Sequence, residues 1–402
     1  MTPNEESLRS AFPSLQQEQI FFDNAGGSQV LGTVISSISD YLSKYNVQLD
    51  ASYAMGQKAT AKFDNAHDIC AKFINAHRDE IVLGSSTTQL LRNLSSALKL
   101  KQGDEIIVSA VDHEANIAPW VDLAEQRGLH LKWWKPNHST NPKLLAGDLE
   151  ALLSPKTRLV TCTHASNILG TITDIKSIAK AAHGVGALVC VDGVGYAAHR
   201  PIDVKDLGID FYCFSWYKVY GPHISMLYAS RAAQHYVRSL GHFFNSHAGL
   251  TAKLGLAGAS YELTQSLPHV VEYLGPPGSP KWRAIIAQEE RLQNTLIDYL
   301  RSRRDVTIYG EPTGDSTVRL STVSFTAQGW NCHKLVKAIE RGTNYGLRSG
   351  CNYAVRLVWE ILGRGQDGVV RVSMLHYNTV DEVTGFIKAL DRVLSANPQA
   401  KL

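Results

Sequence analysis

The stretch "DFYCFSWYKVYGPHISMLYA", from Asp210 to Ala229, decides the fold and raises a chemical question. Each of its ends is apolar over consecutive residues, a pattern that indicates a strand covered on both faces. Between the two strands the chain bends, and Lys218 lies there between Tyr217 and a Val-Tyr-Gly-Pro turn. Burial of an ammonium group costs free energy, so a lysine at this bend needs a chemical reason.

Apolar runs of the same kind recur from about residue 80 onward. They are separated by helical patterns such as Ile175–His183, and strands that alternate with helices form βαβ units. The sequence therefore predicts an α/β protein with a doubly wound, mainly parallel sheet. The runs behind this prediction read "EIIVSA", "RLVTCTHA", "ALVCVDG", "DFYCFS" and "ISMLYA".

The pattern changes at "LGPPGSPKW", from Leu274 to Trp282, where proline and glycine can continue neither a helix nor a strand. We interpret this segment as a hinge before a long helix, roughly over residues 282–301. The later runs "VTIYG", "STVSFTA" and "VVRVSML" are typical of strands in a smaller α+β domain. The expected organisation is a large domain over residues 15–274 and a small domain over residues 275–402, with residues 1–14 packing on the small one.

The composition limits the partners and the location. Of 402 residues, 44% are apolar and 19% are charged, and the net charge of +3 favours neither a nucleic-acid nor a membrane partner. The start, "MTPNEESLRSAFPSL", has no apolar signal core, and no apolar stretch is long enough to span a membrane. The six cysteines show no metal-ligand spacing, and Cys162, Cys190 and Cys213 lie in apolar runs. We therefore expect buried free thiols in a cytoplasmic protein without a metal site.

Four polar residues follow predicted parallel strands, at the edge of the sheet where α/β proteins bind ligands. Asn167 follows "RLVTCT", Asp192 closes "ALVCV", and Ser215 and Lys218 follow "DFYCF". Because the carboxyl ends of parallel strands share one edge, we expect these side chains to lie together. Taken singly, such a lysine is usually a surface charge, and such an aspartate is usually a turn former.

The segment "GSSTTQLL", from Gly84 to Leu91, is typical of a turn that opens a helix. Its backbone N–H groups and the hydroxyls of Ser86, Thr87 and Thr88 suit a phosphate, although such a cluster is often only a helix cap. All these groups together fit pyridoxal 5′-phosphate. Lys218 would bind its aldehyde as a Schiff base, and Asp192 would keep its pyridine nitrogen protonated.

Further motifs extend this interpretation over almost the whole chain, from "FFDNAGGSQ" near residue 22 to about residue 379. They read "VDHEANIAPW", "HASNILGT", "VDGVGYAAHRPIDV", "SWYK" and "VVRVSMLHYNT". On these motifs the chain resembles the class V aminotransferases of fold type I, in the branch of cysteine desulfurases and selenocysteine lyases. The resemblance implies a seven-stranded, mostly parallel sheet, a smaller C-terminal α+β domain, and a homodimer with shared active sites.

The resemblance also implies roles at the site. His113 stacks on the pyridine ring, Asn167 lies by the cofactor's 3′-oxygen and the substrate, and Arg371 binds the substrate α-carboxylate. The simpler alternatives are a helix-capping or core histidine and a structural ion pair of the arginine. The catalytic residues are then Lys218, Asp192 and His113. The other candidates are Ser215, Tyr217 and Ser260 for the cofactor phosphate, and Asn24, Cys351 and Tyr353 for the substrate.

Several positions depart from the family pattern. In "LRSGCNYAV" the nucleophilic cysteine of the desulfurases is replaced by Tyr353, and Cys351 is out of register, which disfavours cysteine desulfuration. Tyr217 replaces the histidine before the lysine and is a poor acid–base group at neutral pH. Gly195 replaces a glutamine and is expected to leave room for a larger substrate. A Gly-Thr pair of the dimer's phosphate site is Gly-Ala here, which leaves Ser260 as the candidate donor.

The implied reaction runs through an external aldimine of an amino acid and a quinonoid carbanion, with Lys218 as the base. Diverged fungal members of natural-product pathways look similar, such as the loline-pathway Mannich cyclase and a ustiloxin-pathway enzyme. We therefore expect C–C bond formation by an intramolecular Mannich-type cyclisation in alkaloid biosynthesis. The alternatives are a β-lyase for C–S or C–Se bonds or of the decarboxylative aldol type, an amino-acid epimerase, and a catalytically inactive binding protein. The joint presence of Lys218, Asp192, His113 and Arg371 disfavours the last of these.

Overall fold

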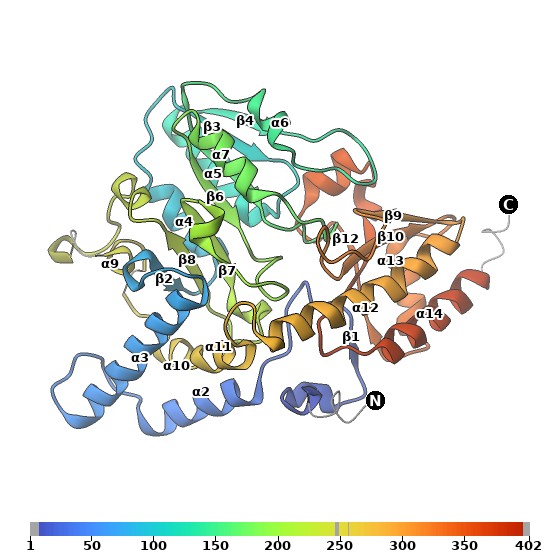
Figure 1. Ribbon diagram of the computed structural model, residues 1–402, viewed down its shortest axis with the longest axis horizontal. Coiled ribbons are helices and arrows are strands. Elements are labelled where there is room, and N and C mark those ends of the chain that lie inside the picture. Colours follow the sequence, from blue (N-terminus) through green and yellow to red (C-terminus); the bar gives the residue numbers. More distant parts are fainter. Residues whose placement is uncertain (1–7, 246–248, 256, 397–402) are drawn as a thin grey trace.

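The computed structural model describes residues 8–245, 249–255 and 257–396. The described residues form a large sheet with helices on both faces and a smaller sheet near the C-terminus (Figure 1). The large sheet has seven strands in the order β2-β8-β7-β6-β5-β3-β4. Their bounds are β2 Ile81–Gly84, β3 Glu105–Ser109, β4 His130–Trp134, β5 Thr157–Thr163, β6 Leu188–Asp192, β7 Phe211–Ser215 and β8 Ser225–Ala229.

Five neighbouring strands pair in parallel, in the order β7-β6-β5-β3-β4. Strand β8 pairs antiparallel with both β7 and β2. The prediction of a seven-stranded, mostly parallel sheet is confirmed. The exception has a simple cause, because the chain returns from β7 to β8 through the short Lys218 bend, and a short connection permits only antiparallel pairing. The bend therefore lies at the carboxyl end of β7, at the same edge as the ends of β5 and β6.

Both faces of the large sheet are covered by apolar side chains. On one face Phe211 and Cys213 pack with Leu94 of helix α4 (Thr87–Ala97), and on the other Tyr212 and Phe214 pack in a separate cluster. The helices of this part are α2 Gly32–Lys44, α3 Ala54–Phe73, α5 Ala118–Arg127, α6 Ala146–Glu150, α7 Ile175–His183, α8 Val204–Leu207, α9 Leu250–Leu254, α10 Tyr261–Thr264 and α11 Pro268–Leu274. The three cysteines of the apolar runs, Cys162, Cys190 and Cys213, are buried and free, as predicted.

Helix α12 (Pro280–Ser302) begins within the last residues of the predicted hinge, two positions earlier than expected, and runs from the large sheet to the C-terminal elements (Figure 1). The second sheet has the order β12-β13-β10-β9, and its neighbours pair antiparallel. Its apolar side chains pack against α12 and α14 in a separate core. The remaining bounds are β9 Val306–Tyr309, β10 Thr322–Ala327, α13 Cys332–Glu340, β12 Arg348–Gly350, β13 Val369–Ser373 and α14 Val380–Ser395.

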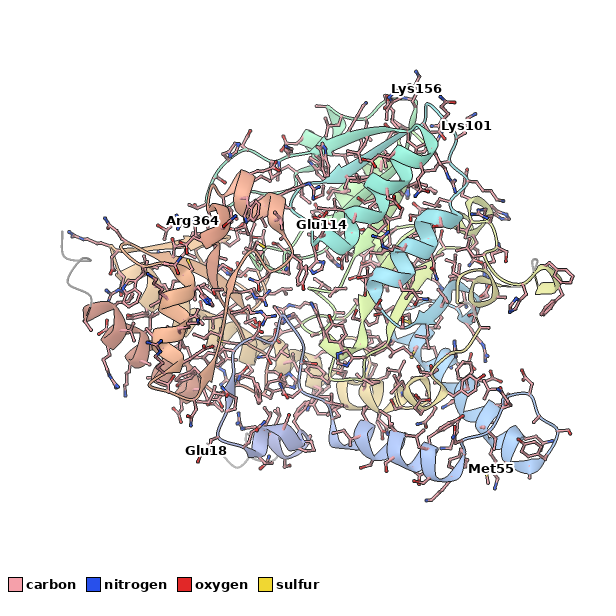
Figure 2. The ribbon with its side chains drawn as sticks, turned by 180° about the vertical axis from the view of Figure 1, so that it is seen from behind. Glu18, Met55, Lys101, Glu114, Lys156 and Arg364 are labelled. Atoms are coloured by element: carbon pink, nitrogen blue, oxygen red, sulfur yellow. The ribbon has the colours of Figure 1, made fainter. Side chains whose placement is uncertain are left out.

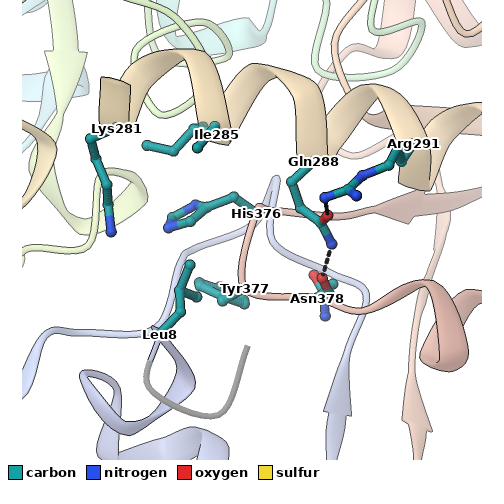
Figure 3. A pocket seen from close by; sticks show the side chains of 9 residues that line it. Leu8, Lys281, Ile285, Gln288, Arg291, His376, Tyr377 and Asn378 are labelled. Atoms are coloured by element: carbon teal, nitrogen blue, oxygen red, sulfur yellow. Dashed lines mark hydrogen bonds between the residues drawn. The ribbon is translucent and has the colours of Figure 1, made fainter. Parts of the chain in front are cut away.

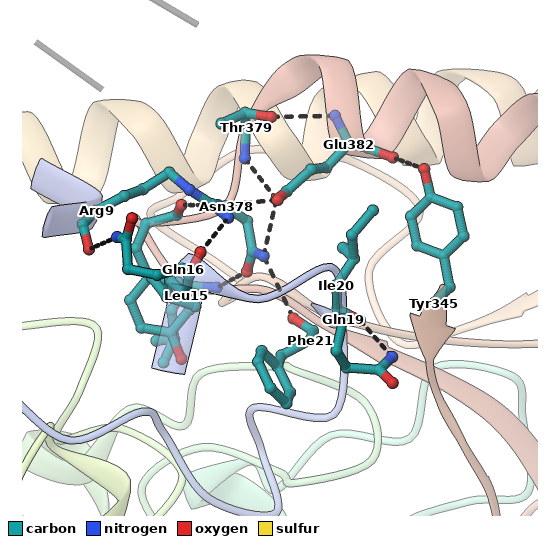
Figure 4. Close-up of polar contacts among 12 residues, drawn as sticks. Arg9, Leu15, Gln16, Gln19, Ile20, Phe21, Tyr345, Asn378, Thr379 and Glu382 are labelled. Carbon is teal, nitrogen blue, oxygen red and sulfur yellow. Dashed lines mark hydrogen bonds and ion pairs between the residues drawn. The ribbon is translucent and has the colours of Figure 1, made fainter. Parts of the chain in front are cut away.

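The beginning of the described chain lies against these C-terminal elements. Strand β1 (Ile20–Phe21) pairs in parallel with β11 (Tyr345–Gly346). Arg9 donates to the Tyr377 carbonyl at 3.1 Å and forms a 2.8 Å ion pair with Glu382 (Figure 4). Residues 8–14 therefore contact the predicted small domain, and residues 1–7 lie outside the described part.

Among the described residues, helices long enough to cross a bilayer are too polar to do so.

Candidate active site

A cavity opens at the carboxyl ends of β5, β6 and β7, and Lys218 lies in its wall. The predicted residues that line it are His113, Asn167, Asp192, Ser215, Tyr217, Lys218 and the Ser86–Thr87–Thr88 segment. Sequence reasoning did not single out the other lining residues, which are Ala115, Thr163, Ala165 and Val194. The structure thus brings together the side chains that were expected at this edge of the sheet.

Lys218 ends the short 3-10 turn Trp216–Lys218 after β7. Burial and the nearby Arg371 lower the pKa of its amine to about 8, while the carboxylates of Asp192 and Asp23 act in the opposite direction. Its Nζ lies 5.7 Å from the Tyr217 ring, and no described residue accepts a hydrogen bond from it. The amine is therefore available to an electrophile at mildly alkaline pH.

Asp192 closes β6 and is buried. Its Oδ1 accepts a hydrogen bond from the Val194 N–H at 2.8 Å. Burial raises the pKa of this carboxyl to about 6, against the effects of that hydrogen bond and of Lys218. A buried carboxyl with spare acceptor capacity suits a cationic N–H donor, which would restore its charge.

Three hydroxyls form a buried cluster below the start of α4. Ser215 Oγ lies 2.6 Å from Thr87 Oγ1 and 2.8 Å from Ser225 Oγ. Ser86 is the N-cap of the helix and accepts from the Gln89 N–H. Thr87 and Thr88 are the first two helical residues, so their N–H groups have no acceptor within the helix. This helix start presents hydroxyl and amide donors to the cavity, as an oxyanion requires.

His113 lies on the other wall of the cavity. Its Nδ1 accepts from the Ala115 N–H at 3.0 Å, which leaves the ring itself facing the cavity. Burial, Lys218 and Arg371 together lower the pKa of His113 to about 4, so the ring is neutral at physiological pH. The expected capping contact and a neutral, stackable ring therefore occur in the same residue.

Arg371, on β13, reaches the site from the second sheet. It donates to Asp23 Oδ1 at 2.7 Å and to the Asn167 carbonyl at 3.1 Å. Its buried Nε has no partner among the described residues, and Arg371 itself is not among the residues that line the cavity, although it bonds to Asn167, which is. Sequence reasoning missed Asp23, which also lies 3.7 Å from Arg348 and so is placed between two guanidinium groups.

Asn24 and Ser260, like Arg371, Cys351 and Tyr353, are not among the residues that line this cavity. Asn24 is buried, its Oδ1 accepts from Tyr377 Oη at 2.5 Å, and its Nδ2 donates to the carbonyls of Phe21 and Ser373. With its amide occupied in this way, Asn24 serves to hold the N-terminal strand. Ser260 lines a separate cavity of about 250 Å³ on the far side of the Gly84–Ser85 turn.

Gly195 lines the Lys218 cavity, but the room there does not lie in the direction of its absent side chain. A Cβ on Gly195 would lie 2.6 Å from the carbonyl oxygen of Ala165. The absent side chain therefore faces backbone rather than open space, and no larger substrate is implied by this position.

Tyr353 and Cys351 lie at the mouth of the site rather than in its wall. The Tyr353 ring is 5.2 Å from the His113 ring, and 68% of the residue is exposed. Cys351 is half-buried and packs against the core of the large sheet. Cys351 therefore does not occupy the place of Tyr353, two residues later in the chain.

Another cavity, of about 190 Å³, lies along α12 (Figure 3). It is lined by Lys281, Gln288, Arg291, His376 and Tyr377, among others, and shares no residue with the Lys218 cavity.

The residues fit pyridoxal phosphate on three independent observations. Among the described residues the Lys218 amine has no hydrogen-bond acceptor, Asp192 has a buried carboxyl with spare acceptor capacity, and α4 begins with amides that have no acceptor within the helix, next to a cluster of hydroxyls. These are the partners that an aldehyde, a pyridine nitrogen and a phosphate require.

Comparison with known proteins agrees with this geometry. The aminotransferase class-V family model matches residues 20–386. The aminotransferase-like protein FGM3 of Gibberella zeae is 55% identical over 394 residues, which are 97% of this chain and 98% of that protein. The nonribosomal peptide synthetase-like enzyme fsqF of Aspergillus fumigatus is 42% identical over 96% of this chain and 26% of its own length.

The crystal structure of the cysteine desulfurase CsdA from Escherichia coli is similar throughout, with a TM-score of 0.84 at 27% identity, covering 98% of this chain and 99% of that chain. This likeness confirms the fold type I architecture. The chain belongs to the class-V aminotransferase family, and its cofactor is pyridoxal 5′-phosphate.

Proposed function

We propose that this enzyme forms a C–C bond on an amino-acid substrate, as an intramolecular Mannich-type cyclase of natural-product biosynthesis. The observation that carries the proposal is the Tyr353 ring beside His113, at the position where desulfurases of the resembling branch carry a thiol. Without a thiol there, sulfur has no acceptor, whereas a carbon electrophile within the substrate needs none. The similarity to FGM3 and to the synthetase-like fsqF supports a natural-product role.

The bound cofactor supplies an electron sink for negative charge at the substrate α-carbon. The residues of this chain bind the substrate and the cofactor and move the proton. Arg371 would orient the α-carboxylate through its guanidinium, and Asp192 would hold the pyridine nitrogen by accepting a hydrogen bond from it. Lys218, with a pKa of about 8, removes the α-proton and holds it at Nζ. The phenol of Tyr217 stays protonated, since burial and the nearby Asp192 raise its pKa.

The active sites are proposed to lie at a homodimer interface, with the small domain beginning at residue 275. Ser260 then serves the phosphate of the partner's site rather than its own, consistent with its place outside the Lys218 cavity.

Incubation of the holoenzyme with amino acids in deuterated water tests the function. Amino acids that carry an internal imine, cysteine and aspartate form the panel. We expect deuterium at the α-carbon and a cyclic product from the imine-bearing members, and neither with Lys218→Ala. Sulfide release from cysteine at an enzymatic rate, lost in Cys351→Ala, would overturn the proposal in favour of desulfuration. Inverted amino acid without a new bond would identify an epimerase instead.

A further inference from the structure

The turn that carries Tyr353 is conformationally strained. The Ala354 N–H donates to the Cys351 carbonyl at 2.9 Å, and the two central residues, Asn352 (φ 44°) and Tyr353 (φ 62°), are both left-handed. Glycine, asparagine and aspartate dominate such positions, and tyrosine is disfavoured there. The buried Nδ2 of Asn352 also has no partner among the described residues, which adds a second cost. The turn must therefore be held by contacts from outside it.

Those contacts come from the wall of the active site. The Asn167 side-chain amide donates to the Asn352 carbonyl at 2.9 Å, and the Glu114 N–H donates to the Tyr353 carbonyl at 2.8 Å. The Glu114 carboxylate also accepts from Arg356 Nη1 at 2.6 Å, and Arg356 opens the π-helix η7 (Arg356–Ile361) just after the turn. Glu114 thus binds the turn through its main-chain N–H, and its side chain binds the residue that opens the helix after the turn. It lies where the large sheet's helices face the C-terminal elements (Figure 2).

Neighbouring residues restrict both members of the Glu114–Arg356 ion pair. The Arg356 guanidinium lies 4.6 Å from the centre of the Trp133 ring, and the Arg356 and Glu114 side chains are 26% and 35% exposed. A stacked, partly shielded guanidinium has a fixed orientation, which a freely solvated surface pair does not. Glu114 in turn lies between His113, whose ring faces the cofactor cavity, and Ala115, which donates to that ring. One short segment therefore positions both His113 and the turn.

We propose that Glu114 and Arg356 are positioning residues of the active site. Their ion pair fixes the strained turn, so that the Tyr353 ring forms the outer wall beside His113 and selects the substrate by the shape of its side chain. The substrate class that this implies is an amino acid whose side chain packs against an aromatic ring. In this respect the inference deepens the proposed function and rests on it. The fixed turn itself is a property of the fold.

Chymotrypsin digestion of the native holoenzyme tests the fixed turn directly. Cleavage after Tyr353 requires an extended backbone, so its rate measures how often the turn opens. We expect slow cleavage of the Tyr353–Ala354 bond in the wild type, and cleavage about fivefold faster in Glu114→Gln and Arg356→Gln, the size that loss of one ion pair allows. Mass spectrometry of the fragments separates this bond from other aromatic sites.

Two further variants make the experiment specific. The charge-reversed double variant Glu114→Arg with Arg356→Glu restores the attraction, and we expect cleavage closer to the wild-type rate than in either single reversal. The Lys135–Glu360 pair, at 3.0 Å, joins the same π-helix to the large-sheet part without touching the turn. Glu360→Gln should therefore leave cleavage after Tyr353 unchanged. Equal cleavage rates in the wild type and Glu114→Gln would overturn the proposal.

The substrate arm uses deuterium exchange at the α-carbon across amino acids of increasing side-chain size. We expect the ratio of kcat/KM for large to kcat/KM for small amino acids to change in Tyr353→Ala and in Glu114→Gln, because KM changes. Tyr353→Phe should keep the wild-type ratio. An unchanged ratio in Tyr353→Ala overturns the specificity role. If no amino acid exchanges in any variant while the cleavage pattern holds, the proposed function fails and the fixed turn stands.

Discussion

At the scale of single residues, the Lys218 amine of the cavity lies in surroundings that disfavour its charge. Burial and Arg371 lower the pKa of Lys218 to about 8, whereas Asp192 and Asp23 partly restore it. The side chain of an ordinary lysine has a pKa of about 10.4. The site therefore keeps a substantial fraction of the amine neutral near physiological pH, the form that both Schiff-base formation and proton abstraction need.

A small acylating reagent reports this pKa in cofactor-free protein. Because the pKa is lowered, the neutral amine is present at lower pH than in other lysines. We expect labelling of Lys218 to be half-maximal near pH 8 and to rise with pH, while exposed lysines require about two units more. Peptide mass spectrometry gives the pH profile for each lysine.

Two substitutions check the cause of this shift, and they act in opposite directions. Arg371→Gln removes a repelling cation, so the Lys218 midpoint should move up. Asp23→Asn removes an attracting carboxylate, so the midpoint should move down. Shifts of the same sign in both variants would contradict the electrostatic account.

At the scale of elements, glycine is needed where the loop after β5 meets the second sheet. Gly170 has φ 69°, and a Cβ there would overlap the carbonyl oxygens of Thr322 and Leu320. The Leu320 N–H also donates to the Gly170 carbonyl at 2.8 Å. This contact places Asn167, three residues earlier, against the Tyr353 turn.

Gly170→Ala should therefore destabilise the protein by more than its backbone angle alone explains. Gly186 is the matched control, since it has φ 76° and nothing within 4 Å of its Cβ position. We expect Gly186→Ala to cost about 1–2 kcal/mol, and Gly170→Ala to cost at least about 1 kcal/mol more because of the overlap. Urea unfolding of both variants measures the difference, and equal costs would show that the loop relaxes freely.

The sequence predicted the elements whose signals are local. The apolar runs of β5, β6 and β7 indicated buried strands, and the parallel order then placed Asn167, Asp192 and Lys218 at one edge. Features that depend on distant pairs were not predictable. The Glu114–Arg356 pair joins residues 242 positions apart, and the amide of Asn24 is occupied by residues about 350 positions away. No window of sequence carries such information.

At the scale of the whole molecule, α12 is tied to the loop that follows Asp192 by a buried ionic cluster. Glu289 is fully buried on α12, and it accepts from His199 Nδ1 at 3.0 Å and from Arg200 Nη1 at 3.1 Å. Arg200 also donates to the Ser316 carbonyl at 3.1 Å, beyond α12 in the chain. The cluster therefore links the large sheet's cofactor edge to the C-terminal elements.

Removing the carboxylate should leave Arg200 buried without a counter-charge. We expect Glu289→Ala to destabilise the protein by about 3–5 kcal/mol, and Glu289→Gln by less, since it preserves shape and a hydrogen-bond acceptor. Urea unfolding of the holoenzyme gives both values. A Glu289→Ala variant as stable as wild type would mean that solvent reaches Arg200.

The pairing of β1 with β11, together with the Asp23–Arg371 ion pair, also bears on how the protein is made. The two charged residues lie 348 positions apart, so this ion pair cannot form until the ribosome has released the chain beyond residue 371. Phe22, fully buried in the finished fold, packs with residues from α12 onward, so its apolar ring stays exposed on the emerging polypeptide until those elements are made. Translation order thus makes Arg371 the last of the predicted site residues to leave the ribosome.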